Sequence, residues 1–445
     1  MNRFAITATF RMIFWAFIPL ISVQAQEMPG AIQEGVNLFS PNGSTLTSLI
    51  DNDGNLIRSW ESEYPPGLGI YLLENGRLLR PANSGSPFFL GGGGGGIIEE
   101  FDRNNQLTWF FQYDNSEHRL HHDVQALPNG NILMIAWERK TEVESIQAGR
   151  DPSRLGAGEV WGLHIIEVEP NRPVGGDIVW EWHVWDHLVQ DFDAAQDNFG
   201  VVVDSPQLVD INFFGLRNHT NPDWNHTNAI HYNPELDQIM VSIHSFSEFW
   251  IIDHSTTTAE AAAHSGGLRD RGGDLLYRWG NPETYRRGTN ADRKLFGQHD
   301  TRWIDAGLPG AGNILLFNNG NQRPGAFSEV LELVPPLNMD GTYTLDPGMA
   351  YGPEQPFWFY QAPIPSDFFS EIISGAQRLQ NGNTLICEGT SGHFFEVTDG
   401  GDVVWDFLEG GFIFRVNRYS SDLFFRAALP GWPNEENVLD LLDTF

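Results

Sequence analysis

Three histidines each open a segment that leads through a turn into an apolar strand. The segments read H-D-V-Q-A-L-P-N-G-N-I-L-M from His122, H-T-N-A-I-H-Y-N-P-E-L-D-Q-I-M-V from His226, and H-D-T-R-W-I-D-A-G-L-P-G-A-G-N-I-L-L from His299. Two further copies, from Leu68 and Ser374, carry no histidine. Because equivalent positions of structural repeats face the same space, this pattern predicts three imidazoles around one shared site.

Three convergent imidazoles allow three kinds of chemistry. They could coordinate a metal ion with a water in the fourth position, act as general acids and bases on a polysaccharide, or supply one nucleophilic nitrogen while their neighbours bind an anion. Asp123 and Asp300 could orient metal-bound histidines. Each directly follows a histidine, however, and so leaves the opposite face of its strand, which favours a structural role. No G-x-S-x-G elbow supports a serine hydrolase.

A second motif, a polar turn followed by an aromatic strand, indicates the fold that positions these histidines. Copies lie near Trp60, Trp109, Trp180, Trp279 and Trp405, with a degraded sixth copy near Trp358. Asn-Gly and similar turn signals recur at irregular spacings between apolar runs. The sequence therefore predicts an all-β fold, a six-bladed β-propeller with long inter-strand insertions.

We expect residues 26–445 to form a single propeller domain. The stretch 34–60 is expected to supply the strands that close the ring, and residues 409–445 a short C-terminal tail. Six consecutive glycines occupy 91–96. No Gly-Lys-Ser/Thr follows them, so we expect a flexible blade connection rather than a phosphate-binding loop.

Composition and charge narrow the classes of partner. The formal net charge of −32 argues against a nucleic-acid partner, because phosphate binding needs clustered Lys and Arg. Residues 1–25 have the pattern of a signal peptide, with an apolar run that is short for a membrane span. We expect a periplasmic or secreted protein without a span after cleavage, an uncleaved anchor being the alternative. Cys387 is the single cysteine, which excludes an intrachain disulfide and a cysteine zinc site.

On a propeller, residues at the start of the innermost strands open onto one end of the central channel. His122, His226 and His299 are expected at that rim, with Asn228 on the same face as His226. His121 and His231 fall on opposite faces from their neighbours. The remaining histidines are assigned structural roles, namely His118, His164, His183, His187, His219, His254 and His264.

Several blocks together resemble one known family. D-W-N-H-T-N-A-I-H-Y-N-P at 223–234, H-H-D-V-Q-A-L-P-N-G-N-I-L-M at 121–134, Q-H-D at 298–300 and S-G-A-Q-R-L-Q-N-G-N-T-L-I at 374–386 look like bacterial arylsulfate sulfotransferases. The resemblance covers about residues 50 to 408, in blocks separated by insertions. It implies a periplasmic six-bladed propeller without a cofactor or a nucleotide sulfate donor. Small-molecule aryl sulfates and phenols would be its substrates, and the oligomeric state stays open, a homodimer included.

The resemblance also implies roles for individual residues. His299 would be the nucleophile of a ping-pong transfer through a sulfated histidine, and His122 and His226, with Asn228, would bind the sulfuryl oxygens. Thr390 would add a hydroxyl contact. From its place on the strand, His121 is a further, weaker candidate for substrate binding. No metal ligand is implied.

One position departs from the family pattern. His244 stands where the family has a sulfate-binding arginine, and Arg323 could substitute for it from the neighbouring blade. Two other functions stay open: a carbohydrate-active or metal-dependent enzyme on the same channel, and a propeller that binds glycans or partners without catalysis.

Overall fold

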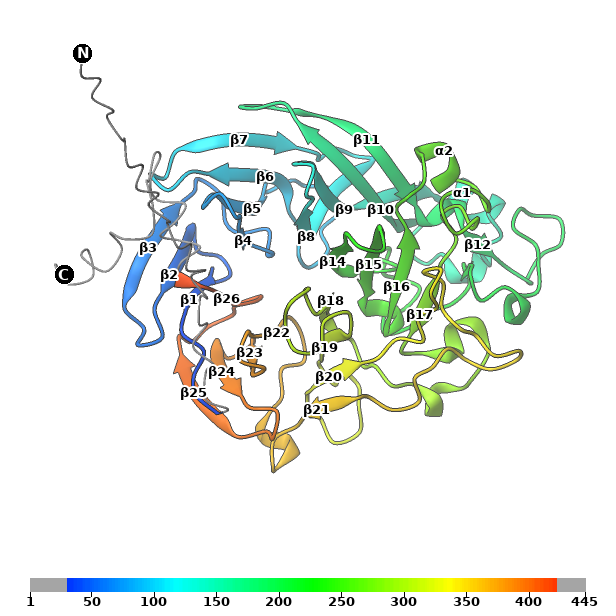
Figure 1. Ribbon diagram of the computed structural model, residues 1–445. Helices are drawn as coiled ribbons and strands as arrows, with labels where there is room; N and C mark the ends of the chain where they lie inside the picture. The colour runs from blue at the N-terminus through cyan, green and yellow to red at the C-terminus, as the bar shows by residue number, and fades with distance from the viewer. Residues whose placement is uncertain (1–29, 422–445) are drawn as a thin grey trace, which may run out of the picture.

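The computed structural model describes residues 30–421, which form six four-stranded antiparallel sheets around a central axis (Figure 1). The first sheet contains β26 (Asn417–Tyr419), β1 (Val36–Phe39), β2 (Leu46–Ile50) and β3 (Leu56–Glu61), and the second contains β4 (Tyr71–Leu72), β5 (Leu78–Asn83), β6 (Gly96–Phe101) and β7 (Leu107–Gln112). The third contains β8 (His118–Ala126), β9 (Ile132–Thr141), β10 (Glu159–Pro170) and β11 (Gly176–His183). The fourth contains β14 (Thr227–Asn233), β15 (Gln238–Ile243), β16 (Glu248–Asp253) and β17 (Tyr277–Trp279). The fifth contains β18 (His299–Trp303), β19 (Ile314–Asn318), β20 (Glu329–Leu333) and β21 (Trp358–Tyr360), and the sixth contains β22 (Gly375–Arg378), β23 (Thr384–Glu388), β24 (His393–Val397) and β25 (Val403–Leu408). The predicted six-bladed propeller is confirmed.

Long insertions separate several strands, as expected. Helix α1 (Glu142–Gln147) follows β9, and α2 (Thr258–Ala261) follows β16. The longest insertion lies between β11 and β14 and includes a short parallel pair, β12 (Leu188–Val189) with β13 (Val209–Asp210). Each helix follows a threonine N-cap whose side chain accepts a backbone hydrogen bond in a capping box, and Thr141, the N-cap of α1, is also the last residue of β9.

The apolar runs of the middle strands follow from packing on both faces. In β15 every residue is buried, and alternate side chains enter different cores: Ile239 and Val241 pack with the third blade, whereas Met240 packs with the fifth. A strand buried on both faces has no polar side, so its sequence does not alternate. Core formation therefore joins each blade to both of its neighbours.

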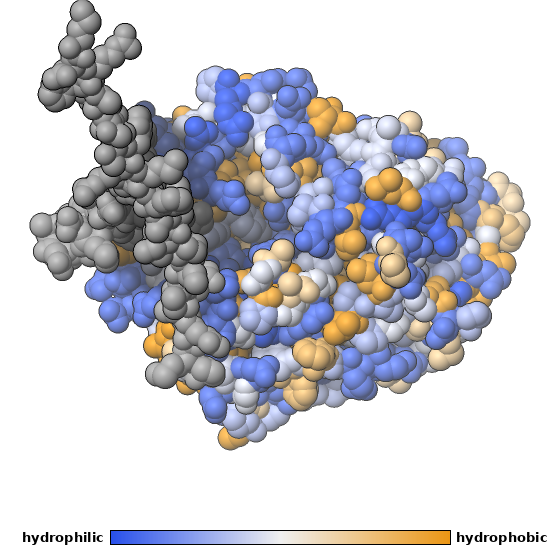
Figure 2. Space-filling view, in the orientation of Figure 1, coloured by the Kyte–Doolittle hydropathy of each residue, from blue (hydrophilic) through white to orange (hydrophobic). Residues whose placement is uncertain are grey.

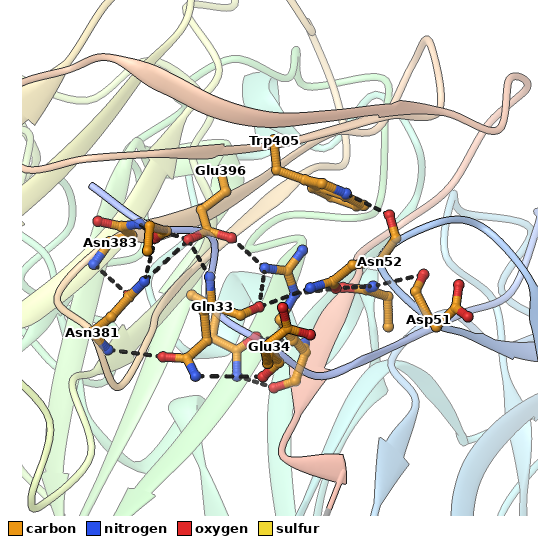
Figure 3. Close-up of polar contacts among 12 residues, drawn as sticks. Gln33, Glu34, Asp51, Asn52, Asn381, Asn383, Glu396 and Trp405 are labelled. Carbon is orange, nitrogen blue, oxygen red and sulfur yellow. Dashed lines mark hydrogen bonds and ion pairs between the residues drawn. The ribbon is translucent and has the colours of Figure 1, made fainter. Parts of the chain in front are cut away.

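The ring closes by pairing the two ends of the described chain. Strand β26 pairs with β1 in the first blade, so part of the segment expected as a C-terminal tail supplies an innermost strand instead. Glu396 fastens the sixth blade to this one, because it accepts a hydrogen bond from the Gln33 amide (2.9 Å) and pairs with Arg418. Figure 3 also shows Asn383 of the sixth blade, whose Nδ2 donates to Glu396 over 2.6 Å and holds it in place. The expected signal peptide lies outside the described residues.

Six indole hydrogen bonds link the blades in a closed circle. In every blade a tryptophan on the outermost strand donates its Nε1–H, over 2.7–2.9 Å, to a backbone carbonyl in the connection that precedes the outermost strand of the next blade. The pairs are Trp60 with Asp102, Trp109 with Gly175, Trp182 with Gly273, Trp279 with Pro353, Trp358 with Asp399, and Trp405 with Asn52. The second sequence motif thus marks the joints between blades.

The surface is mixed in polarity. Figure 2 shows one face of the molecule, on which hydrophilic residues predominate and hydrophobic ones form separate patches. Within residues 30–421, no helix has the length and apolar character needed to cross a membrane.

The indole bonds yield a prediction about stability. Trp60 is 1% exposed, and Trp60→Phe keeps an aromatic ring while removing the indole donor from the Asp102 carbonyl, which still accepts from the Asn105 amide. We expect a loss of about 0.5–1.5 kcal/mol in the free energy of unfolding, measured by urea titration. Trp303→Phe is the matched control, since the Trp303 indole donates no such bond among residues 30–421. Equal losses in both variants would contradict a role for the indole bond.

Candidate active site

One buried arginine connects the innermost strands of the propeller. Arg415, just before β26, pairs with Asp123 of β8 (Nη2 to Oδ2, 3.2 Å) and with Asp300 of β18 (Nε to Oδ1, 3.0 Å). It also donates to the hydroxyl of Tyr71 on β4, which in turn donates to Asp123 over 2.7 Å. Arg302 pairs with Asp300 over 2.5 Å and donates a hydrogen bond to Asn417 of β26 over 3.3 Å. We call this group the Arg415 network.

Backbone amides bring the remaining two strands into the same network. Asp123 accepts from the amide of Ile230 on β14 (3.2 Å), and Asp300 accepts from the amide of Ala376 on β22 (3.0 Å). All six innermost strands therefore meet at two carboxylates and two guanidinium groups, whose charges balance. Burial lowers the pKa of Arg415, but the nearby carboxylates outweigh it and the pKa is raised, so the cation persists at every relevant pH.

A left-handed backbone turns the histidines toward the rim of the channel. The φ angles are 56° at His122, 44° at His226 and 51° at Asp300, and the copies without histidine show 100° at Leu68 and 87° at Ser374. Each of β8, β14 and β18 also shifts its pairing register beside its histidine. Such bulges cost of order 1–3 kcal/mol where a non-glycine residue adopts them, and they re-aim side chains. Here they send His122 to the rim and its neighbour Asp123 into the Arg415 network.

Four imidazoles form the histidine cluster: His122, His226, His244 and His299. Ring centroids are 4.7 Å apart between His122 and His226, 5.1 Å between His226 and His244, and 5.2 Å between His244 and His299. The four side chains belong to residues that are only 3–7% exposed. The three repeat histidines are thus brought together, and His244 fills the gap between two of them.

The hydrogen bonds around His299 define its tautomer. Asn319 Nδ2 donates to the carbonyls of Ser370 and Ile373, both over 2.8 Å, so its Oδ1 faces His299. The 2.8 Å contact from His299 Nδ1 to that oxygen must then be donated by the imidazole. Nε2 consequently carries a lone pair, which accepts from the Ile373 amide over 3.2 Å. This is the protonation pattern that a nucleophilic imidazole needs.

A carboxylate sets the charge around His226. Asp223 lies 2.5 Å from His226 Nδ1, accepts from the Trp137 indole (2.8 Å), and lies 3.6 Å from Arg217 Nη2. Burial raises the pKa of Asp223, but His226 and Arg217 outweigh it and hold the pKa at about 2. An anion at this position accepts the hydrogen bond from Nδ1 of His226 and fixes the orientation of its ring.

Polar atoms without partners mark the interior of the cluster. Both ring nitrogens of His244 are buried and have no hydrogen-bond partner among residues 30–421, and the same holds for Asn228 Oδ1 and Arg217 Nε. Asn228 Nδ2 instead donates to the carbonyl of Gln298 (2.8 Å), which holds the backbone preceding His299. Unpartnered buried groups of this kind are costly unless a ligand satisfies them.

Burial keeps most of the cluster neutral. Desolvation, followed by repulsion between neighbouring imidazoles, holds the pKa of His122 well below its usual range, and the pKa of His244 falls in the same way. Desolvation lowers the pKa of His299 to about 3 despite the hydrogen bond to Asn319. His121 stacks on Trp137 at 4.1 Å and shares a 2.8 Å Nδ1–Nδ1 contact with His122, and burial lowers its pKa to about 3.

The six-glycine run, which we expected to be a flexible blade connection, packs over this cluster. Residues 91–96 lie between β5 and β6 of one blade, and the Gly93 carbonyl accepts from the His122 amide over 2.9 Å. A Cβ at Gly93 would lie 2.1 Å from His122 Nε2, and one at Gly91 would lie 2.8 Å from Trp137. Only glycine permits so close an approach of backbone to imidazole, so the run has a packing requirement.

Two predicted substrate contacts lie further from the histidines. Thr390 Oγ1 accepts from Ser370, whose carbonyl anchors Asn319, so Thr390 reaches His299 only through this chain of hydrogen bonds. Arg323 pairs with Glu329 over 2.6 Å and lies over the ring of Phe327. Its charge is already compensated there.

Sequence reasoning missed several residues of the site. Phe414 lies 6.1 Å from His122 and 6.2 Å from His299, and both it and Arg415 belong to the expected C-terminal tail. Asn319 stands in the block L-L-F-N-N-G, whose pattern indicates a strand but no side-chain role, and Arg217 lies in an insertion without a clear period. The pairing of β26 with β1 is the signal that places the C-terminal segment in the channel.

Comparison with known proteins assigns the family. The model of the family described as arylsulfotransferase (ASST) matches residues 23–409. The chain belongs to the arylsulfotransferase family. A protein of unknown function from Bacteroides caccae has a similar structure (TM-score 0.47, 11% identity, 87% of this chain and 99% of that one), as does virginiamycin B lyase from Staphylococcus aureus (0.39, 9%, 85% and 82%). No curated protein matches the sequence.

The neutral cluster predicts how stability of this arylsulfotransferase family member changes with pH. In the unfolded chain His299 has its usual pKa of 6.5, whereas in the folded protein its pKa is about 3. As the pH falls below 6.5, the unfolded chain therefore binds a proton that the folded protein does not. Each such histidine lowers the free energy of unfolding by about 1.4 kcal/mol per pH unit. Histidines with raised pKa values, such as His254 at about 9, are protonated in both states below 6.5 and add no slope.

We therefore expect the urea midpoint to fall between pH 6.5 and pH 4.5, and to fall less steeply in His299→Asn. The difference in slope should approach 1.4 kcal/mol per pH unit, since one neutral imidazole has been removed. His254→Asn, which removes a histidine of the opposite kind, serves as the control and should leave the slope in this window unchanged. Identical slopes in the parent and in His299→Asn would contradict the buried neutral state.

Proposed function

We propose that the protein transfers a sulfuryl group from an aryl sulfate ester to a phenol through a sulfohistidine at His299, without a nucleotide sulfate donor. The observation that carries the proposal is the fixed tautomer of His299, in which Asn319 holds the Nδ1 proton and leaves Nε2 with a lone pair. Membership of the arylsulfotransferase family supports the same chemistry. Secretion to the periplasm remains part of the proposal.

Both half-reactions balance around this lone pair. His299 Nε2 attacks sulfur, the S–N bond forms as the bond from sulfur to the aryl oxygen breaks, and the phenolate departs with a proton from His226. The second phenol then returns a proton to His226 as its oxygen attacks sulfur and the S–N bond breaks. His226 suits this exchange because the anionic Asp223 stabilises its protonated ring. As in phosphoryl transfer, catalysis rests on positioning and on charge stabilisation.

The remaining groups of the cluster would hold the sulfuryl oxygens. His122 and His244 supply neutral N–H donors, and the two unpartnered nitrogens of His244 are otherwise unexplained. We assign the missing cationic contact to Arg217 rather than to Arg323. Arg217 lies 3.6 Å from Asp223 beside the cluster, and its charge adds to the desolvation that depresses the pKa of His244. Arg323 is committed to Glu329.

The glycine run sets a condition for access. Because it packs against His122 and the cluster is buried, substrate must enter beside the run or displace it. The Ile373 amide must also leave Nε2 before attack, which exchanges one hydrogen bond for the bond to sulfur. Ile373 has a left-handed φ of 52°, so this peptide already carries strain.

A transfer assay tests the nucleophile. With p-nitrophenyl sulfate and an added phenol, we expect His299→Ala to lose about 10³-fold or more in rate, because the lone pair that Asn319 orients is lost. His393→Ala is the control and should retain the parental rate. It removes a histidine of β24 that is held by Glu388 and Asp406. Full transfer by His299→Ala would exclude the mechanism.

The arginine assignment has its own test. Arg217→Gln should raise KM for the aryl sulfate about 10- to 100-fold, the effect of losing one hydrogen bond to a charged group. KM for the phenol acceptor, which is uncharged, should change little. Arg323→Gln is the matched control, and a larger effect there than at Arg217 would reverse the assignment.

A further inference from the structure

A second group of histidines lies on the third blade, on the outer strands. His164 of β10 pairs in register with His183 of β11, and their rings stack with centroids 4.0 Å apart. Glu181 precedes His183 by two residues and so projects from the same face of the sheet. The ligand atoms of all three side chains lie within 4.8 Å of one another.

Two imidazole nitrogens of this group approach one carboxylate oxygen. His164 Nε2 and His183 Nε2 lie 3.3 Å and 3.5 Å from Glu181 Oε2, and the shorter contact is a long hydrogen bond. Ligands at 2.0–2.1 Å from a tetrahedral metal lie about 3.3–3.4 Å apart. The two distances therefore match the spacing of metal ligands.

A further carboxylate orients one of the rings. Glu138 of β9 contacts His183 Nδ1 over 3.1 Å through one oxygen, and its other oxygen pairs with Lys140 over 2.7 Å. Hydrogen bonding of the far ring nitrogen to a carboxylate is the usual support of a metal-bound histidine. His164 is buried, whereas the Glu181 side chain is 37% exposed, which leaves one side open to water.

We propose that His164, His183 and Glu181 bind a zinc-type divalent cation, with a water as the fourth ligand. Two imidazoles and one carboxylate are a common zinc set, whereas calcium and magnesium require oxygen ligands. Binding requires the rings to tilt from their interplanar angle of 16°, which the partly exposed His183 permits. The ion would cross-link β10 and β11, independently of the proposed sulfuryl transfer.

Another cluster provides the contrast. His187 and His264 both contact Asp274 Oδ1, over 2.9 Å and 2.7 Å, and His187 Nε2 already donates to the Ala261 carbonyl over 2.8 Å. These are hydrogen-bond distances, and one ring has both nitrogens engaged. His264→Ala is therefore a matched control: it removes a histidine from a similarly spaced histidine–carboxylate cluster in which both nitrogens of His187 are already engaged.

Zinc titration of the full chain tests the proposal. After treatment with a chelator and dialysis, calorimetry with Zn²⁺ should show one site that Glu181→Gln and His183→Asn each weaken at least about tenfold, and that Glu138→Gln weakens about tenfold. Co²⁺ should give the visible spectrum of a tetrahedral complex. His264→Ala and His299→Ala should bind as the parent does, and circular dichroism should show every variant folded.

Three results would overturn the site. One is the absence of stoichiometric Zn²⁺ binding by the folded protein. Another is parental affinity in folded Glu181→Gln and His183→Asn. The third is loss of binding in His264→Ala or His299→Ala, which would place the ion at Asp274 or in the histidine cluster.

Discussion

The Arg415 network is the constraint on which the rest of the structure depends. A single buried guanidinium between Asp123 and Asp300, extended by Tyr71 and Arg302, joins all six innermost strands. Replacing a buried ion pair by apolar groups is often tolerated, but removing one partner leaves an uncompensated charge and costs about 3–5 kcal/mol. The network thus specifies how the strands meet more than it adds to stability.

The same network explains why histidine and aspartate are adjacent on two strands. On β8, the left-handed turn at His122 directs that imidazole to the rim while Asp123 turns inward to Arg415. On β18, the left-handed residue is Asp300, one position later, and His299 still reaches the rim. Each His-Asp pair therefore couples the position of a proposed catalytic group to the ion pair at the centre. A substitution at Arg415 would disturb the cluster without touching it.

The repeat pattern predicts the fold and much of the site because both depend on local sequence. Turn signals and aromatic strands recur in each blade, and the shared repeat position of His122, His226 and His299 is enough to bring them to one site. Arg415 and Phe414 cannot be found this way, since they reach the channel only when β26 pairs with β1, almost the whole chain away. The packing of the glycine run could not be predicted from the sequence, because its close approach to His122 is a tertiary contact. His244 could be found as a site residue only from the family resemblance. Arg217 could not be found from the sequence, because the fold of an insertion brings it to the site.

The central claim is that His299 carries the sulfuryl group between donor and acceptor. Intact-mass spectrometry after mixing the protein with an aryl sulfate, without a phenol acceptor, tests it most directly. We expect a mass gain of one sulfuryl group that disappears when a phenol is added and is absent in His299→Ala. A parental protein that releases phenol but never gains this mass, or a His299→Ala variant that still gains it, would contradict the account.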